Sequence, residues 1–190
     1  MNRPLPGPMA ALYHLRVPSS GGLRLGVIAT EDGLGRMTIS EQFGGAVAVA
    51  GWEAGGQVVI FDLREGCRLE GRSAGGIFGM GELPLDRAVR LLGGRLPALT
   101  EDSILQGDRS SVEIVGEDWR TLVDLESDPW RIVRVTGDGF EVVLDRHTAS
   151  VAGRLRLSGT DGDWAELELV RLQWGLAGEA PDLPDLPYCE

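Results

Sequence analysis

The chain has 190 residues with 18 basic and 29 acidic side chains, which gives a net charge of −11. This balance argues against nucleic acid as a partner, because phosphate binding needs a cationic face, and against electrostatic adhesion to anionic lipid. All the basic side chains are arginine, so a P-loop lysine, a Schiff-base lysine and a Ser–Lys dyad are excluded.

The length fits one domain with a sizeable core. The 28 glycines and 10 prolines interrupt the sequence often, as a β protein with many turns requires. No apolar run approaches the roughly 20 residues of a bilayer-spanning helix. Residues 1–10 are rich in proline and are predicted to be disordered.

Short runs of alternating apolar and polar residues fill the first half of the chain, separated by turn sequences such as PSSGG, QFGG and EAGG. In one run Leu23, Leu25 and Val27 share a face. Residues 58–63 are apolar on both faces, which predicts a central strand covered on both sides. The runs predict antiparallel strands at residues 11–17, 22–29, 34–41, 46–52, 57–63 and 67–71.

The segment 75–106 breaks this alternation. Four apolar residues recur at the i, i+3, i+4, i+7 spacing of one helical face: Leu85, Ala88, Val89 and Leu92. Pro84 suits a first helical turn, and Gly93-Gly94 suits a left-handed stop. A second, weaker helical piece is predicted at 97–105. One amphipathic helix cannot bury its apolar stripe alone, so we expect the strands to supply the surface that it covers.

Alternating runs resume after this segment. In the last of them the apolar residues change face at Leu169–Val170, which predicts a β-bulge or a strong bend. The acidic, Pro-rich tail 176–190 is predicted to have no structure. The expected strands lie at residues 111–116, 119–125, 130–136, 140–145, 151–158 and 164–174.

These elements predict a mainly β fold of the α+β class, with about 11–12 antiparallel strands in a strongly curved sheet or incomplete β-barrel. A single domain at 11–175 carries the helical insertion at 77–106 as a lid on the concave apolar face. There is too little helix for a doubly wound fold.

No motif for catalysis or cofactor binding stands out, and we expect neither an enzyme nor a cofactor. Ser73 lies in a G-x-S-x-G pattern, but the glycine-rich residues 75–81 resist the helix that a nucleophile elbow needs. His14 alternates with apolar residues in a predicted strand, and His147 lies in a predicted turn. No spacing of His, Cys, Asp or Glu matches a metal site.

The two cysteines, Cys67 and Cys189, are too few for a zinc cluster. An extracytoplasmic location would allow them to pair, and a free thiol on the tail is an equal alternative. The N-terminus lacks the charged and apolar regions of a signal peptide. The chain is therefore either cytoplasmic or an exported protein without its signal peptide, and the sequence leaves both alternatives open.

The insertion carries more apolar residues than the helical stripe explains. Either they fill a packed core, or the helix is a removable lid over an apolar cavity, with its glycine-rich flanks as hinges. The additional residues are Ile77, Phe78, Met80, Leu83, Leu91, Leu96 and Leu99.

The run LPLDRAVRLLGGRLP at 83–97, set between two groups of strands over 11–175, resembles the bacterial lipoprotein-localisation factors LolA and LolB, and especially the LolB-like envelope lipoproteins. The resemblance implies an incomplete barrel whose apolar cavity receives lipid or lipoprotein acyl chains, without a catalytic step. It places the protein in the periplasm or at the periplasmic face of the outer membrane, and we expect a monomer. Two features depart from the family, since residues 1–20 lack a long helix and no lipid-attachment cysteine lies near residue 1.

Residue roles follow from the same resemblance. Phe43, in a loop after an early strand, matches the bulky apolar residue that the outer-membrane receptor projects. Arg24 and Arg36 are the candidates for the early-strand arginine that holds the lid. The competing hypothesis is a structural or assembly protein of the envelope, with a solid core and a protein partner. The cavity residues implied by the carrier hypothesis are Leu85, Val89, Leu92, Ile77, Phe78, Phe61, Phe140 and Val142.

Overall fold

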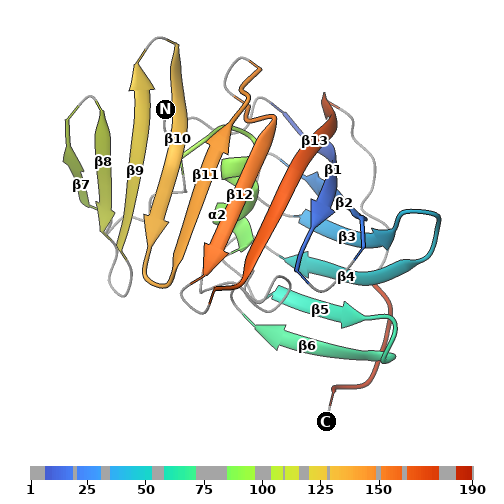
Figure 1. Ribbon diagram of the computed structural model, residues 1–190. Helices are drawn as coiled ribbons and strands as arrows, with labels where there is room; N and C mark the ends of the chain where they lie inside the picture. The colour runs from blue at the N-terminus through green and yellow to red at the C-terminus, as the bar shows by residue number, and fades with distance from the viewer. Residues whose placement is uncertain are drawn as a thin grey trace.

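One large sheet dominates the computed structural model of the chain (Figure 1). The structure describes residues 7–18, 21–30, 35–52, 58–71, 85–96, 104–108, 110–115, 120–127, 129–148, 151–159, 162–175 and 183–189. The described helix is α2 (Leu85–Leu92). The strands are β1 (Met9–Arg16), β2 (Leu23–Ala29), β3 (Gly35–Glu41), β4 (Ala46–Trp52), β5 (Val58–Asp62), β6 (Cys67–Gly71), β7 (Ile104–Gly107), β8 (Ser111–Val115), β9 (Arg120–Ser127), β10 (Trp130–Gly137), β11 (Phe140–Asp145), β12 (Arg154–Gly159) and β13 (Trp164–Trp174).

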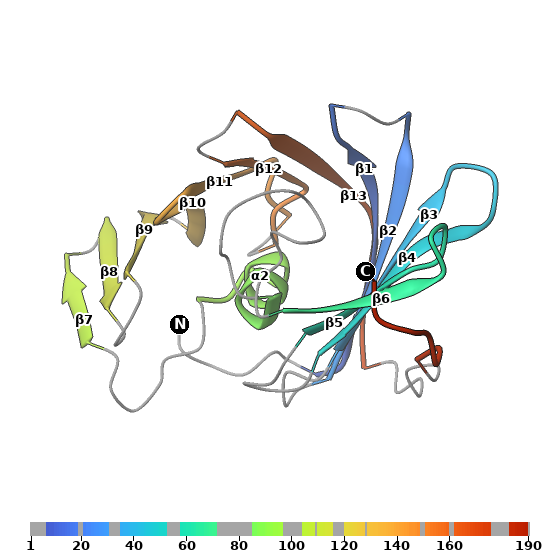
Figure 2. The same cartoon turned by 90° about the horizontal axis from the view of Figure 1, so that it is seen from below.

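All thirteen strands in the described residues belong to one sheet, in the order β6-β5-β4-β3-β2-β1-β13-β12-β11-β10-β9-β8-β7. Each half is an antiparallel meander, because short connections pair each strand with the next one along the chain. The halves join where β1 pairs with β13. The sheet curves strongly and α2 lies on its concave side (Figure 2). The predicted fold class, a curved and open antiparallel sheet, is confirmed.

Two elements differ from the expectation. Residues 104 and 105, assigned to a second helical piece, begin strand β7, which pairs with β8. A short helix is marginal in water, whereas pairing with β8 satisfies the backbone groups on that side of the strand. Strand β5 lies next to the edge strand β6 and is not central. Its residues Ile60 and Phe61 are nevertheless buried on opposite faces, as the apolar run predicts.

The core lies on the concave face of the sheet, toward which alternate strand residues point. In β1 the buried residues Tyr13 and Leu15 alternate with the exposed residues His14 and Arg16. The same core cluster extends across the sheet from β5 to β8 and includes buried residues of α2. The convex face, opposite α2, carries most of the charged side chains of the strands.

Strand β13 contains the predicted β-bulge. Its ladder with β1 shifts register at Val170, which is exposed. Leu167, before the bulge, is in the core, and Leu172 and Trp174, after it, pack against the same core. The extra residue reverses the alternation, so the apolar residues on both sides of the bulge face inward.

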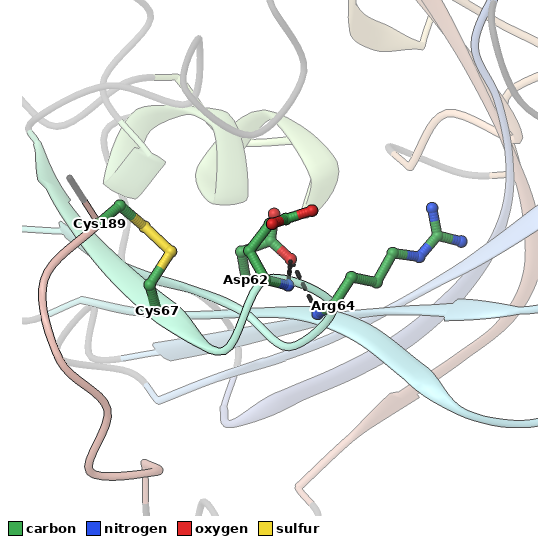
Figure 3. The surroundings of a disulfide bond; sticks show 5 residues. Asp62, Arg64, Cys67 and Cys189 are labelled. Carbon is green, nitrogen blue, oxygen red and sulfur yellow. Dashed lines mark hydrogen bonds between the residues drawn. A yellow bond between two sulfur atoms is a disulfide. The ribbon is translucent and has the colours of Figure 1, made fainter.

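The C-terminal residues 183–189, predicted to have no structure, are docked on the sheet, and we call them the strap. Leu183 lies over Gly51 on the convex face of β4, where an added Cβ would come within 2.6 Å of Leu183 Cδ1. A larger residue at this position would require the Leu183 side chain to shift. A disulfide joins Cys189 of the strap to Cys67 at the start of β6 (Figure 3).

Candidate functional site

Helix α2 lies on the concave side of the sheet (Figure 2). Val89, Leu91 and Leu92 are 2%, 1% and 3% exposed and belong to the same core cluster as the strand residues. A helix of eight residues is too short to be stable alone, so its contacts with the sheet stabilise it. The predicted helix is present at Leu85–Leu92, and Val89 and Leu92 of its predicted stripe are buried, together with Leu91 outside the stripe.

The helix ends at the predicted glycines. Gly94 has a φ of 68°, and its N–H donates to Leu91 O at 2.9 Å. The Arg95 N–H donates to Arg90 O at 2.9 Å, which completes a Schellman motif. The Arg90 Nε–H adds a bond of 2.9 Å to the carbonyl of Leu96, a buried residue. This turn fixes the direction of the chain after the helix.

Several residues predicted to line a cavity do lie on the concave face. Val89 and Leu92 on α2 and Val142 on β11 are buried there, and Phe140 is partly buried against the same cluster. These residues come from segments about 50 positions apart, and the curvature of the sheet brings them to one face. The remaining predictions concern side chains outside the described part of the structure, namely Leu85, Ile77 and Phe78.

Phe61 is not on the concave face. Val58 and Ile60 of the same strand belong to the core cluster, so alternation places Phe61 on the convex face. It is 3% exposed there and pairs with Val49 of β4. The prediction that Phe61 lines the cavity is therefore wrong. A run that is apolar on both faces does not reveal which residues face inward, because a shift of one position reverses the faces.

Arg24 and Arg36 also lie on the convex face. Arg24 precedes the buried Leu25 in β2, and Arg36 precedes the buried Met37 in β3. Arg36 lines a convex pocket of about 280 Å³ together with residues of β1, β2 and β13. Because the sheet separates both side chains from α2, the expectation that one of them holds the lid is corrected.

Phe43 stands at the tip of the turn between β3 and β4 and is 95% exposed. The Glu41 N–H donates to Gly45 O at 3.2 Å, and the Gly44 N–H donates to Glu41 O at 3.3 Å. No heavy atom of the described residues lies within 4 Å of a Cβ built on Gly44 or Gly45. The predicted exposure of Phe43 is confirmed, and the turn projects it away from the sheet.

The concave face also holds polar groups that the sequence pattern does not reveal. Tyr13 on β1 is fully buried, and its hydroxyl has no hydrogen-bond partner among the described residues. Burial raises the pKa of Tyr13 well above its ordinary value, so the phenol stays protonated. The Nε1–H of Trp52 on β4 likewise lacks a partner within the described part of the chain. Alternation in β1 indicates that Tyr13 is buried, but not that its hydroxyl is isolated.

The described residues contain no group of three or more His, Cys, Asp or Glu side chains that could hold a metal. His14 is exposed on β1, and His147 Nε2 lies 2.8 Å from the carbonyl oxygen of Ile132.

Hydrogen bonds from Arg154 hold the pKa of Asp145 below its ordinary value, and this pair links β11 to β12. Ser73 lies outside the described residues. Within the described part, no helix has the length and apolar character needed to cross a bilayer.

Neither a family model nor a curated protein matches this sequence. Among solved structures, a LolA superfamily protein from Nitrosomonas europaea matches with a TM-score of 0.55. The match covers 95% of this chain and 89% of that chain, at 11% sequence identity. The chain has a LolA-like fold. At this identity the likeness concerns the fold alone. It extends over almost the whole length of the chain.

Proposed function

We propose that this protein is a non-catalytic carrier or receptor that holds lipid or lipoprotein acyl chains in the bacterial cell envelope. The observation that carries the proposal is the concave apolar face, with α2 laid over it, in a LolA-like fold. Acyl chains need no catalytic group, because each CH₂ removed from water contributes about 0.8 kcal/mol.

In this proposal α2 is the lid. A ligand displaces it from the sheet and replaces the contacts of Val89 and Leu92 with contacts of its own acyl chain. The sheet side of the site includes Val142 and Phe140. The Tyr13 hydroxyl donates a hydrogen bond to an ester or amide carbonyl of the ligand, which satisfies a group that is otherwise unpaired in the described structure.

The envelope location is supported by the Cys67–Cys189 disulfide, because structural disulfides persist in oxidising compartments. Phe43 supplies the contact with the membrane interface, or with acyl chains presented by an envelope protein. An exposed aromatic residue on a projecting turn is suited to such a contact, since its apolar ring is not needed in the core.

A second function is favoured by one observation. Val89, Leu91 and Leu92 are buried by other residues of the chain and belong to its core cluster. Such close contact fits a solid core, and hence a structural or assembly protein of the envelope whose surface binds a protein partner. The two functions differ in whether the concave face ever opens.

Native mass spectrometry of freshly purified protein tests this difference. The carrier function predicts a population with added masses of acyl lipids, which dissociate as the collision energy rises. After delipidation, incubation with an acylated peptide restores a complex of equal stoichiometry. A protein that carries no lipid and takes up none after delipidation has a solid core.

A further inference from the structure

The strap closes the edge of the sheet at β6. The Arg68 N–H donates to Pro187 O at 2.7 Å, and the Cys189 N–H donates to Arg68 O at 3.0 Å. These bonds form a parallel bridge between Arg68 and Tyr188. The backbone N–H and C=O of Arg68, which an edge strand otherwise presents to another chain, are thereby occupied by the protein itself.

Apart from the disulfide, the strap has few buried contacts. The Tyr188 ring lies 4.3 Å from the Arg68 guanidinium, and its hydroxyl donates to Glu70 Oε1 at 2.6 Å. Tyr188 is 56% exposed and Leu183 is 42% exposed. Contacts at exposed sites are weak, so the covalent bond between Cys67 and Cys189 is the main restraint that keeps the strap at the edge.

Strand β6 does not depend on the strap for its position. It pairs with β5 along its whole length, through the ladder from Val58–Gly71 to Asp62–Cys67. In the turn between these strands, Asp62 Oδ1 accepts the N–H groups of Arg64 at 2.9 Å and of Glu65 at 3.1 Å (Figure 3). Loss of the strap therefore leaves β6 in place with an open edge.

The sequence of β6, CRLEG, is complementary to itself in an antiparallel arrangement. With Leu69 opposite Leu69 of a second copy, Arg68 of each chain lies opposite Glu70 of the other. Arg68 and Glu70 share the convex face, since their partners on β5 are Phe61 and Val59. Opposite charges on directly opposed residues stabilise strand pairs, and a two-fold axis through Leu69 repeats the interaction.

We propose that the Cys67–Cys189 disulfide is a latch on this edge, and that its reduction lets β6 pair with β6 of a second copy of the chain. A dithiol reductant supplies two electrons and two protons. The S–S bond breaks, both cysteines become thiols, and the dithiol closes to its own disulfide. The strap then leaves the edge, while the oxidised protein stays monomeric. The latch does not depend on the carriage of lipid.

The test compares the oxidised protein with the full-length variant carrying Cys67→Ser and Cys189→Ser. Hydrogen exchange reports whether residues 183–189 are released, and sedimentation equilibrium over a concentration series reports dimerisation. The variant is expected to exchange rapidly in the strap and to dimerise, and the wild type is expected to do so only after dithiol treatment. Circular dichroism checks that each protein keeps its sheet.

Charge reversal then identifies the interface. In the double-serine variant, Arg68→Glu places like charges opposite each other twice and weakens the dimer about tenfold. Adding Glu70→Arg restores opposite charges and the original affinity. Arg134→Glu, an exposed arginine on β10, is the matched control and leaves dimerisation unchanged.

Three results overturn the proposal. A strap that stays protected after reduction shows that the disulfide is not its restraint. A released strap without dimerisation shows that the β6 edge does not bind a second copy. A dimer that is insensitive to the Arg68 and Glu70 exchange forms through another surface.

Discussion

The hydroxyl oxygen of Tyr13 lies in the core and is proposed to hydrogen-bond to the ligand. Its hydroxyl is buried without a partner among the described residues, and an unsatisfied buried group of this kind costs about 1–3 kcal/mol. Tyr13→Phe is therefore expected to raise the free energy of unfolding by about 1 kcal/mol in the absence of lipid. It should also reduce the extra stability conferred by an ester or amide lipid.

Denaturant unfolding with and without lipid measures both effects. Tyr188→Phe is the control, since that hydroxyl is exposed and bonded to Glu70. If Tyr13→Phe lowers the stability of the ligand-free protein, the hydroxyl has a partner in the native state and is not available to a ligand.

Because Phe43 is exposed, its proposed role in membrane contact can be tested without a change in stability. Phe43→Glu should change the free energy of unfolding by no more than about 0.5 kcal/mol, because the side chain makes no core contact. It should reduce association with lipid vesicles or transfer of an acylated peptide. Gln42→Glu adds a charge to the same turn without removing the ring, and it should leave both properties unchanged. Equal losses in the two variants would assign the effect to charge alone.

At the scale of elements, α2 is either a lid over a cavity or a helix of a packed core, and the stability of one variant distinguishes the two. Leu92→Ala in a close-packed core costs about 2–5 kcal/mol, because a void remains. For a lid, the expected loss without ligand is below about 2 kcal/mol, and the variant gains less stability than the wild type when fatty acid is added. Melting curves with and without fatty acid measure both quantities.

Leu25→Ala, at a fully buried position on β2, is the sheet-side comparison and should show the full core penalty. A loss of several kcal/mol for Leu92→Ala without lipid, equal to that of Leu25→Ala, would assign α2 to the core and remove the main support for the carrier function.

The molecule is a single curved sheet with one described helix on its concave side. Its proposed function depends on whether an apolar ligand binds between the sheet and the helix. An environment-sensitive apolar dye is expected to bind the folded protein and to be displaced, in a saturable manner, by fatty acid or an acylated peptide. The reason is that one cluster of buried apolar residues extends across the sheet from β5 to β8. Displacement is followed by fluorescence, with the heat-unfolded protein as the control. A folded protein that binds no dye contradicts an accessible cavity.

Local pattern was enough to predict the described strands other than β7, the helix at α2 and the bulge at Val170. Alternation, turn glycines and the stripe on α2 act over a few residues, so they are visible in the sequence. The glycine stop after Leu92 and the exposure of Phe43 were predictable for the same reason. The curved, open sheet followed from the many short turns between consecutive runs.

Tertiary structure alone decided the rest, because it depends on contacts between distant residues. Phe61 lies on the convex face and not in the cavity, since a run apolar on both sides does not specify its inward face. Arg24 and Arg36 are separated from α2 by the sheet, which no local pattern indicates. The pairing of Cys67 with Cys189, 122 residues apart, depends on the tail returning to β6, and so does the closed edge that this pairing creates. The sequence determined which segments form strands and helix, while packing between them decided which side chains share a face.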